Sequence, residues 1–291
     1  MTVLELVERC GERLEAAGVS YGHGTDCAFD EAAWLVLWRL GWPLDALDAV
    51  ADRPVALADA NRCEALVAQR IESRQPAAYL TGEAWLQGVP FHVDARTIVP
   101  RSYIAELIAQ GMLEHWLAGD PLRVLDLCTG NGSLAVLAAM AWPQARVDAT
   151  DLSVAALEVA ARNVERHALG PRITLLQGDG LAPARGPYDL ILCNPPYVPR
   201  TSMARLPPEH RAEPALALAG GEDGMDFVRP LLRELRRDPA RHLGAQGVLV
   251  LEIGHERGHF EAAFPELDPV WLPTSADGDP VLLLTREALA Q

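Results

Sequence analysis

Four consecutive residues, Asn194-Pro195-Pro196-Tyr197, have the chemistry to hold a flat nitrogen group. They follow the apolar run ILC at residues 191–193, which predicts a buried strand, and two prolines without N–H groups cannot continue its hydrogen bonding. The side-chain carbonyl of Asn194 and the backbone carbonyl of Pro195 are then free to accept hydrogen bonds from one –NH2 group, while the ring of Tyr197 packs on its plane. The alternative is a turn that only ends a strand, because Asn-Pro and Pro-Pro are ordinary turn signals.

A turn with two glycines and three carboxylates form a second candidate site. In the segment DLCTGNGS, a strand ends at Asp126, and a turn with Gly130 and Gly132 leads into a helix whose free N–H groups suit an anionic ligand. Asp151 ends the next strand, 19 residues past Gly132, where a carboxylate can bind ribose hydroxyls. Asp179 follows the third strand, within reach of an adenine amino group. The alternative is an α/β protein with capping aspartates and turn glycines.

The elements that must position these residues alternate between strands and helices after Pro100. Short apolar runs predict strands, and helical periodicity predicts the helices between them. The predicted strands are residues 122–127, 145–150, 172–177, 188–193, 247–253 and 280–285, and the predicted helices are residues 132–141, 153–168 and 225–237. This order predicts a doubly wound, mostly parallel sheet that binds ligands at the carboxyl ends of its strands.

The first hundred residues predict a separate helical part. The helical stretches are residues 2–17, 29–40 and 59–74. A turn signal at Gly88–Pro90, between apolar stretches, predicts a β-hairpin. We therefore expect a helical domain at 1–84, a hairpin linker at 85–99 and an α/β domain at 100–291.

The composition excludes several kinds of chemistry. All 25 cationic side chains are Arg, so no Lys can serve as a Schiff base, a P-loop residue or a general base. Forty acidic residues give a net charge of −15, which disfavours direct nucleic-acid binding. The five cysteines have no metal-ligand or CxxC spacing, and no apolar run is long enough to span a membrane. We expect a cytoplasmic protein with reduced thiols and no bound metal.

The ordered glycines and aspartates resemble the S-adenosylmethionine site of class I methyltransferases. The NPPY tetrapeptide resembles amino-methyltransferases of planar nitrogens, in the form typical of the protein-(glutamine-N(5)) methyltransferase family. Further segments resemble the branch that modifies large-subunit ribosomal protein L-three: YGHGTD at 21–26, AAYLTGEAWLQGVPFHVD at 77–94, VPRSYIAEL at 99–107 and LPPEHRAEPALALAGGEDGMDFVRPLL at 206–232. The release-factor branch instead tends to show PRPxTE and DLGTGTG, from which this chain departs at Ser102 and Cys128.

The resemblance implies a fold, a reaction and a set of residues. The fold is Rossmann-like, with an N-terminal helical domain that recognises the substrate. The reaction moves a methyl group from S-adenosyl-L-methionine to a glutamine side-chain amide of ribosomal protein L-three, leaving S-adenosyl-L-homocysteine. The implied cofactor-binding residues are Asp126, Thr129, Gly130, Asn131, Gly132, Asp151, Leu152, Asp179, Gly180 and Asn194, and the implied catalytic residues are Asn194, Pro195, Pro196 and Tyr197.

Other functions stay open at this point. One is methylation of release factors, and another is methylation of adenine amino groups in nucleic acid, with the base flipped into the same pocket. The acidic balance and the lack of Lys argue against the second. A third is an inactive adenosylmethionine-binding assembly factor, which the intact NPPY disfavours.

Three polar residues outside the motifs also carry expectations. Arg101 either pairs with a carboxylate at the mouth of the cofactor site or lies on the surface. His23, far from the motifs in sequence and flanked by glycines, is expected to have a structural or substrate-docking role. Glu252, close to His255, is expected to be an exposed loop charge rather than half of an acid–base dyad.

Overall fold

Five helices form the N-terminal lobe in the computed structural model, which describes all residues from Met1 to Gln291. They are α1 (Val3–Ala16), α2 (Ala28–Leu40), α3 (Leu47–Val50), α4 (Leu57–Ser73) and α5 (Ala77–Thr81). Helix α1 begins with a capping box, because the Thr2 side chain accepts from the Glu5 N–H while the Glu5 side chain accepts from Thr2. The apolar face of α1 then packs with α2 and α4 in a core separate from the rest of the molecule.

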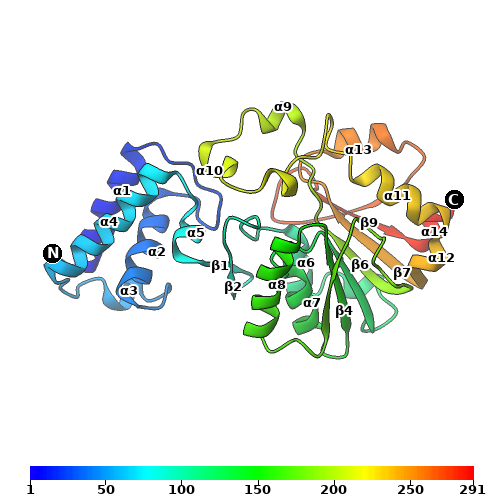
Figure 1. The fold of residues 1–291 in the computed structure, drawn as a ribbon, viewed down its shortest axis with the longest axis horizontal. Coiled ribbons are helices and arrows are strands. Elements are labelled where there is room, and N and C mark those ends of the chain that lie inside the picture. Colours follow the sequence, from blue (N-terminus) through cyan, green and yellow to red (C-terminus); the bar gives the residue numbers. More distant parts are fainter.

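A hairpin of β1 (Glu83–Leu86) and β2 (Val89–His92) joins this lobe to the rest (Figure 1). It begins two residues ahead of the expected linker, because Gly82 ends α5 in a left-handed conformation at φ 71°. Ala84 faces the core of the helical lobe, whereas Leu86 and Phe91 face the core of the second lobe. Both cores therefore share the hairpin.

Seven strands form the central sheet of the second lobe, in the order β5-β4-β3-β6-β7-β9-β8. They are β3 (Arg123–Leu127), β4 (Arg146–Asp151), β5 (Ile173–Gln177), β6 (Tyr188–Cys193), β7 (Leu243–Glu252), β8 (Val270–Leu272) and β9 (Val281–Thr285). Strands β3 to β7 are parallel, while β9 pairs antiparallel with β7 and β8. This confirms the predicted mostly parallel sheet. Strand β8 was not predicted, because three residues are too few to show an alternating pattern.

Helices cover both faces of the sheet (Figure 1). One face carries α6 (Tyr103–Ala109), α7 (Ser133–Ala141) and α8 (Val154–Arg166), and the other carries α11 (Val228–Arg237), α12 (Pro239–His242), α13 (Arg257–Ala263) and α14 (Arg286–Leu289). Side chains alternate along each strand, so Val124 of β3 faces the first layer and Leu125 the second. No helix of the chain has the length and apolar character that a membrane crossing requires.

The chain order of the strands reverses between β3 and β6, which are neighbours in the sheet. In doubly wound folds, ligands bind at such a switch point, outside the carboxyl ends of the strands. The long segment after β6 passes above this edge and contains α9 (Arg200–Met203), α10 (Pro208–Arg211) and a 3-10 turn at Ala215–Ala217. Figure 1 shows α10 reaching toward the helical lobe.

Candidate active site

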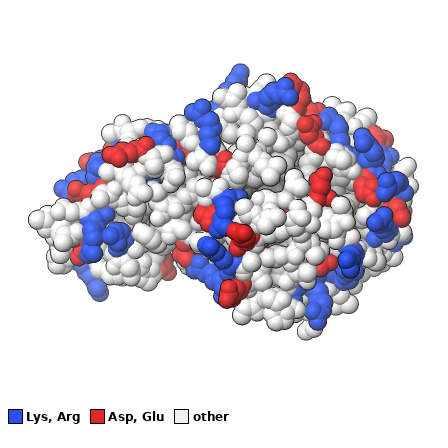
Figure 2. Space-filling model, in the orientation of Figure 1, with Lys and Arg blue, Asp and Glu red and all other residues white.

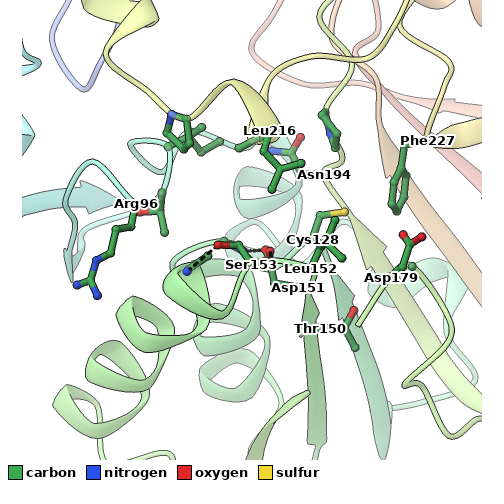
Figure 3. A pocket seen from close by; sticks show the side chains of 18 of the residues that line it. Arg96, Cys128, Thr150, Asp151, Leu152, Ser153, Asp179, Asn194, Leu216 and Phe227 are labelled. Carbon is green, nitrogen blue, oxygen red and sulfur yellow. Dashed lines mark hydrogen bonds between the residues drawn. The ribbon is translucent and has the colours of Figure 1, made fainter. Parts of the chain in front are cut away.

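A pocket, here called the first pocket, opens at this edge of the sheet (Figure 3). The segments that follow β3, β4, β5 and β6 all line it. Six of the predicted cofactor-binding residues line it: Gly130, Asp151, Leu152, Asp179, Gly180 and Asn194. The other four, Asp126, Thr129, Asn131 and Gly132, are not among its lining residues. Residues distant in sequence thus converge on one cavity.

The turn after β3 folds tightly against β4. The Thr129 N–H donates to the Thr150 carbonyl at 2.9 Å, and the Gly130 N–H donates to Asp151 Oδ2 at 2.9 Å. Gly130 has φ 56°, and a Cβ there would have no protein atom closer than 4.0 Å, so this backbone borders open space. Gly132 has another role, because its Cβ would lie 3.1 Å from the Cβ of Ala160 on α8. Because Gly132 has no Cβ, α7 and α8 can pack closely at this point.

Asp126 lies beneath the first pocket and is fully buried. Its Oδ2 accepts from the Thr129 hydroxyl at 2.5 Å and from the Ala135 N–H at 3.0 Å, which fastens the turn to the start of α7. Its Oδ1 has no partner within the protein, and neither does the buried Nδ2 of Asn131. Burial raises the pKa of Asp126 to about 7. Unpaired buried atoms of this kind suit a ligand that carries both donors and acceptors.

The other two carboxylates differ in their surroundings. Asp151 accepts from the N–H groups of Gly130 and Ser153, and burial raises its pKa despite these bonds. Asp179 is exposed at the opposite side of the pocket, where Figure 3 shows it beside the ring of Phe227. An aromatic ring and a free carboxylate in one wall suit a flat heterocycle with an amino group.

A second pocket adjoins the first. The two share the lining residues Ile98, Asn194 and Ala217. Pro195 and Tyr197 line only the second pocket, and Pro196 lines only the first. The side chain of Asn194 makes no hydrogen bond within the protein. The NPPY segment is therefore the partition between two cavities, with the Asn194 amide free at their junction.

Glycines allow the chain to close tightly around Tyr197. A Cβ on Gly220 would lie 2.6 Å from Tyr197 Cα, and one on Gly254 would lie 2.6 Å from Cε2 of its ring. Burial raises the pKa of Tyr197, and its hydroxyl lies 3.4 Å from Glu252 Oε1, to which it donates. The phenol is therefore neutral and fixed in orientation.

Glu252 is fully buried, so the expectation of an exposed loop charge is wrong. Strand β7 extends to this residue and pairs it with Val281, and the start of α6 covers its side chain. Its Oε2 accepts from the Ser102 hydroxyl at 2.6 Å and from the Tyr103 N–H at 2.9 Å. Burial raises the pKa of Glu252 to about 7, although these bonds oppose the shift. The sequence signal available for the contact with Glu252 was Ser102, which caps α6.

Arg101 and His23 meet at a residue that the sequence did not single out. Arg101 lines the second pocket rather than the first, and its guanidinium forms two hydrogen bonds with Glu213. His23 is buried, with Nε2 3.4 Å from Glu213 Oε2 and its ring centroid 4.2 Å from that of His210. The sequence motifs also gave no indication of several lining residues of the first pocket: Arg96, Thr97, Ile98, Ser153, Leu216 and Phe227.

Known proteins resemble this chain along nearly its whole length. Two family models match it: the methyltransferase small domain over residues 106–205 and the PrmC N-terminal domain over residues 5–82. A protein of Bordetella pertussis named ribosomal protein uL3 glutamine methyltransferase is 56% identical, over 99% of this chain and 96% of its own. Proteins of the same name are 48% identical in Burkholderia pseudomallei and 45% identical in Neisseria meningitidis serogroup B, over 99% of this chain and 95% and 94% of their own.

Among solved structures, the catalytic domain of hMettl16, crystallised with a hairpin of the MAT2A 3'UTR, superposes with a TM-score of 0.53. The superposition covers 78% of this chain and 80% of that one, at 14% identity. At this identity the likeness concerns the fold alone, and it is a Rossmann-like methyltransferase fold.

Proposed function

The chain belongs to the ribosomal protein uL3 glutamine methyltransferase family, and from this premise we propose its reaction and substrate. It transfers a methyl group from S-adenosyl-L-methionine to the side-chain amide nitrogen of a glutamine in large-subunit ribosomal protein uL3. The observation that carries the proposal is Asn194, whose unpaired amide lies where the two pockets meet. One cavity then serves the methyl donor and the other the glutamine.

The first pocket fits the cofactor. Asp151 would bind the ribose, and Asp179 with Gly180 would lie beside the adenine, against Phe227. The residues proposed for the methionine part are Asp126, Thr129, Gly130, Asn131 and Gly132, with Leu152 and Asn194 lining the same cavity. When bound, S-adenosylmethionine supplies a methyl group activated by a positively charged sulfur. The chain has only to hold the two reactants in line.

The NPPY segment would hold the glutamine amide. Two hydrogen bonds, to Asn194 Oδ1 and to the carbonyl of Pro195, would fix the –NH2 group, and Tyr197 would pack on the amide plane. Positioning of this kind contributes about 7–11 kcal/mol to lowering the barrier. An amide nitrogen is a weak nucleophile because its lone pair is delocalised. The two oxygens would stabilise the positive charge that develops on it as the N–CH3 bond forms and the S–CH3 bond of the donor breaks. S-adenosylhomocysteine is then the leaving group, and the nitrogen gives up one proton to water.

In this proposal the two lobes have different functions, substrate recognition and catalysis. Residues 1–84 form the substrate-recognition domain, residues 85–99 the linker, and residues 100–291 the catalytic domain. On the face that Figure 2 draws, Arg and acidic side chains are interspersed over both lobes, without a continuous basic strip for nucleic acid. We propose that the enzyme acts in the cytoplasm, where ribosomal proteins are made, with no direct nucleic-acid or membrane contact.

The test is a methylation assay with labelled S-adenosylmethionine. Purified uL3, a release factor and ribosomal RNA are offered separately, and the labelled protein is digested and sequenced by mass spectrometry. We expect one methyl group on one glutamine of uL3. Label confined to the release factor or to RNA would overturn the proposed substrate.

A further inference from the structure

Glu213 carries a fully buried carboxylate that lies beside residues of both lobes. It accepts from the Val99 N–H at 2.8 Å and from both terminal nitrogens of Arg101 at 2.6 Å, and His23 Nε2 of the helical lobe lies 3.4 Å away. Burial alone would raise the pKa of Glu213, but the neighbouring His23 and the hydrogen bonds from Arg101 lower it to about 2. The carboxylate is therefore ionised and held from several sides.

The residues that follow Glu213 form a wall of both pockets. Pro214, Leu216 and Ala217 line the first pocket, and Ala217 and Leu218 line the second. We call residues 214–218 the shared wall. Glu213 fixes its beginning. Its end is tied to the segment after the NPPY motif, because the Val198 N–H donates to the Leu218 carbonyl at 2.8 Å.

The helical lobe holds the same segment at a second point. Arg70 of α4 is fully buried and donates to Glu31 at 2.9 Å, to Glu209 of α10 at 3.2 Å and to the Ser20 carbonyl at 3.0 Å. Nε of Arg74 lies 2.7 Å from Glu209 Oε1. Two sets of ion pairs therefore hold the segment after β6. Arg70 and Arg74 pair with Glu209, and Arg70 also with Glu31, while Arg101 pairs with Glu213.

We propose that Glu213 is a positioning residue for methyl transfer, through which the helical lobe sets the place of the shared wall between the two pockets. The inference rests on the proposed function, since it assigns the second pocket to the glutamine. In this proposal His23 acts through Glu213. Arg70 binds Glu209 of α10 and so holds the segment before Glu213 in place. The helical lobe therefore contributes to the rate of the reaction as well as to substrate binding.

The principal variant is Glu213→Gln, which keeps the volume of the side chain. Its –NH2 group faces the N–H groups of Arg101, so one of the two 2.6 Å bonds is lost and the shared wall shifts. A misplacement of about 1 Å costs on the order of 100-fold in rate. We expect kcat to fall about 10- to 100-fold at saturating cofactor, while the KM for uL3 changes less than about threefold.

Two further variants separate positioning from folding. The matched control is Asp189→Asn, because Asp189 accepts from the N–H groups of Leu122 and Arg123 at the opposite edge of the sheet. We expect it to keep its kcat. His23→Phe keeps an aromatic ring against His210 and loses the nitrogen that faces Glu213. We expect a smaller fall in kcat, and a double variant with Glu213→Gln no slower than Glu213→Gln alone.

Hydrogen exchange gives a readout that is independent of the substrate. The amides of Val198, Leu218, Ala219 and Gly220 bond within the shared wall and its partner segment, and we expect them to exchange faster in Glu213→Gln without any ligand. Unchanged exchange, or a kcat per folded molecule equal to that of the wild type, would overturn the inference. Failure of the wild type to label uL3 would overturn the proposed function instead, and faster exchange in Glu213→Gln would still show that Glu213 holds the shared wall in place.

Discussion

The hydroxyl of Tyr197 faces the buried carboxyl of Glu252, with 3.4 Å between the tyrosine oxygen and Glu252 Oε1. The other oxygen of that carboxyl accepts from the Ser102 hydroxyl and the Tyr103 N–H, at the first turn of α6. One carboxyl therefore connects the aromatic ring of the NPPY segment to the helix that follows the linker. Any change in its protonation acts on both.

The titration of Glu252 makes stability depend on pH. Its pKa of about 7 in the folded protein lies above the ordinary 4.5, so the folded state binds the proton more tightly. The free energy of unfolding therefore falls as pH rises from about 4.5 to 7, by up to about 3 kcal/mol from this group. Glu252→Gln cannot titrate, and its urea unfolding should show a shallower decline between pH 5 and pH 8. Asp126 titrates in both proteins, so equal slopes would contradict this role of Glu252.

Asn194→Ala should abolish turnover while cofactor binding stays measurable. The change removes one of the two acceptors for the glutamine amide, and loss of one such transition-state contact costs about 100- to 1,000-fold in kcat. Turnover is measured by transfer of labelled methyl groups to uL3, and binding by calorimetry with S-adenosylhomocysteine. Asn61→Ala, at an exposed position of α4, is the control and should leave both unchanged. Turnover by Asn194→Ala at the wild-type rate would refute the role given to this amide.

Gly130→Ala should weaken cofactor binding more than it weakens the fold. A methyl group at φ 56° is strained by about 1–2 kcal/mol and borders the first pocket. We expect the Kd for S-adenosylhomocysteine to rise at least about tenfold. Gly18→Ala is a matched control, because Gly18 has φ 57° with nothing within 4 Å of its Cβ and does not line that pocket. It should lower Tm with no change in Kd; equal Kd values for the two variants would count against the cofactor site.

Asn163→Ala should lower the free energy of unfolding, because Asn163 joins the β1–β2 hairpin to the turn after β3. The buried amide of Asn163 bonds the N–H and the carbonyl of His92 in β2 and the carbonyl of Asn131 in the turn after β3. Buried groups left without partners lower the free energy of unfolding, here by about 2–4 kcal/mol. Urea unfolding measures this loss, with the exposed Asn61→Ala as the control. A change below about 1 kcal/mol would show that water replaces the lost bonds.

The sequence predicted the strand ends and the two motifs because both are local. Apolar runs mark strands buried on both faces, and Pro195 with Pro196 marks where one must stop. Glu213 was not predicted, because its partners His23 and Arg101 lie 190 and 112 residues away and no local pattern connects them. The segment at 206–232 that contains Glu213 resembled the family as a whole, but it indicated no role for that residue. Glu252 was misplaced because the strand ends beside it and Gly254, His255 and Glu256 follow, a composition typical of an exposed loop, whereas its neighbours in space belong to α6.

The buried guanidinium of Arg70 limits which helical and catalytic lobes can be combined in a hybrid of two related enzymes. A hybrid that joins this helical lobe to another protein's catalytic lobe carries Arg70 into the junction without assurance of a carboxylate at the place of Glu209. Removing one partner of a buried ion pair costs about 3–5 kcal/mol, a large share of a domain's stability. A graft aimed at a new substrate therefore has to move α10 together with the helices that bind it.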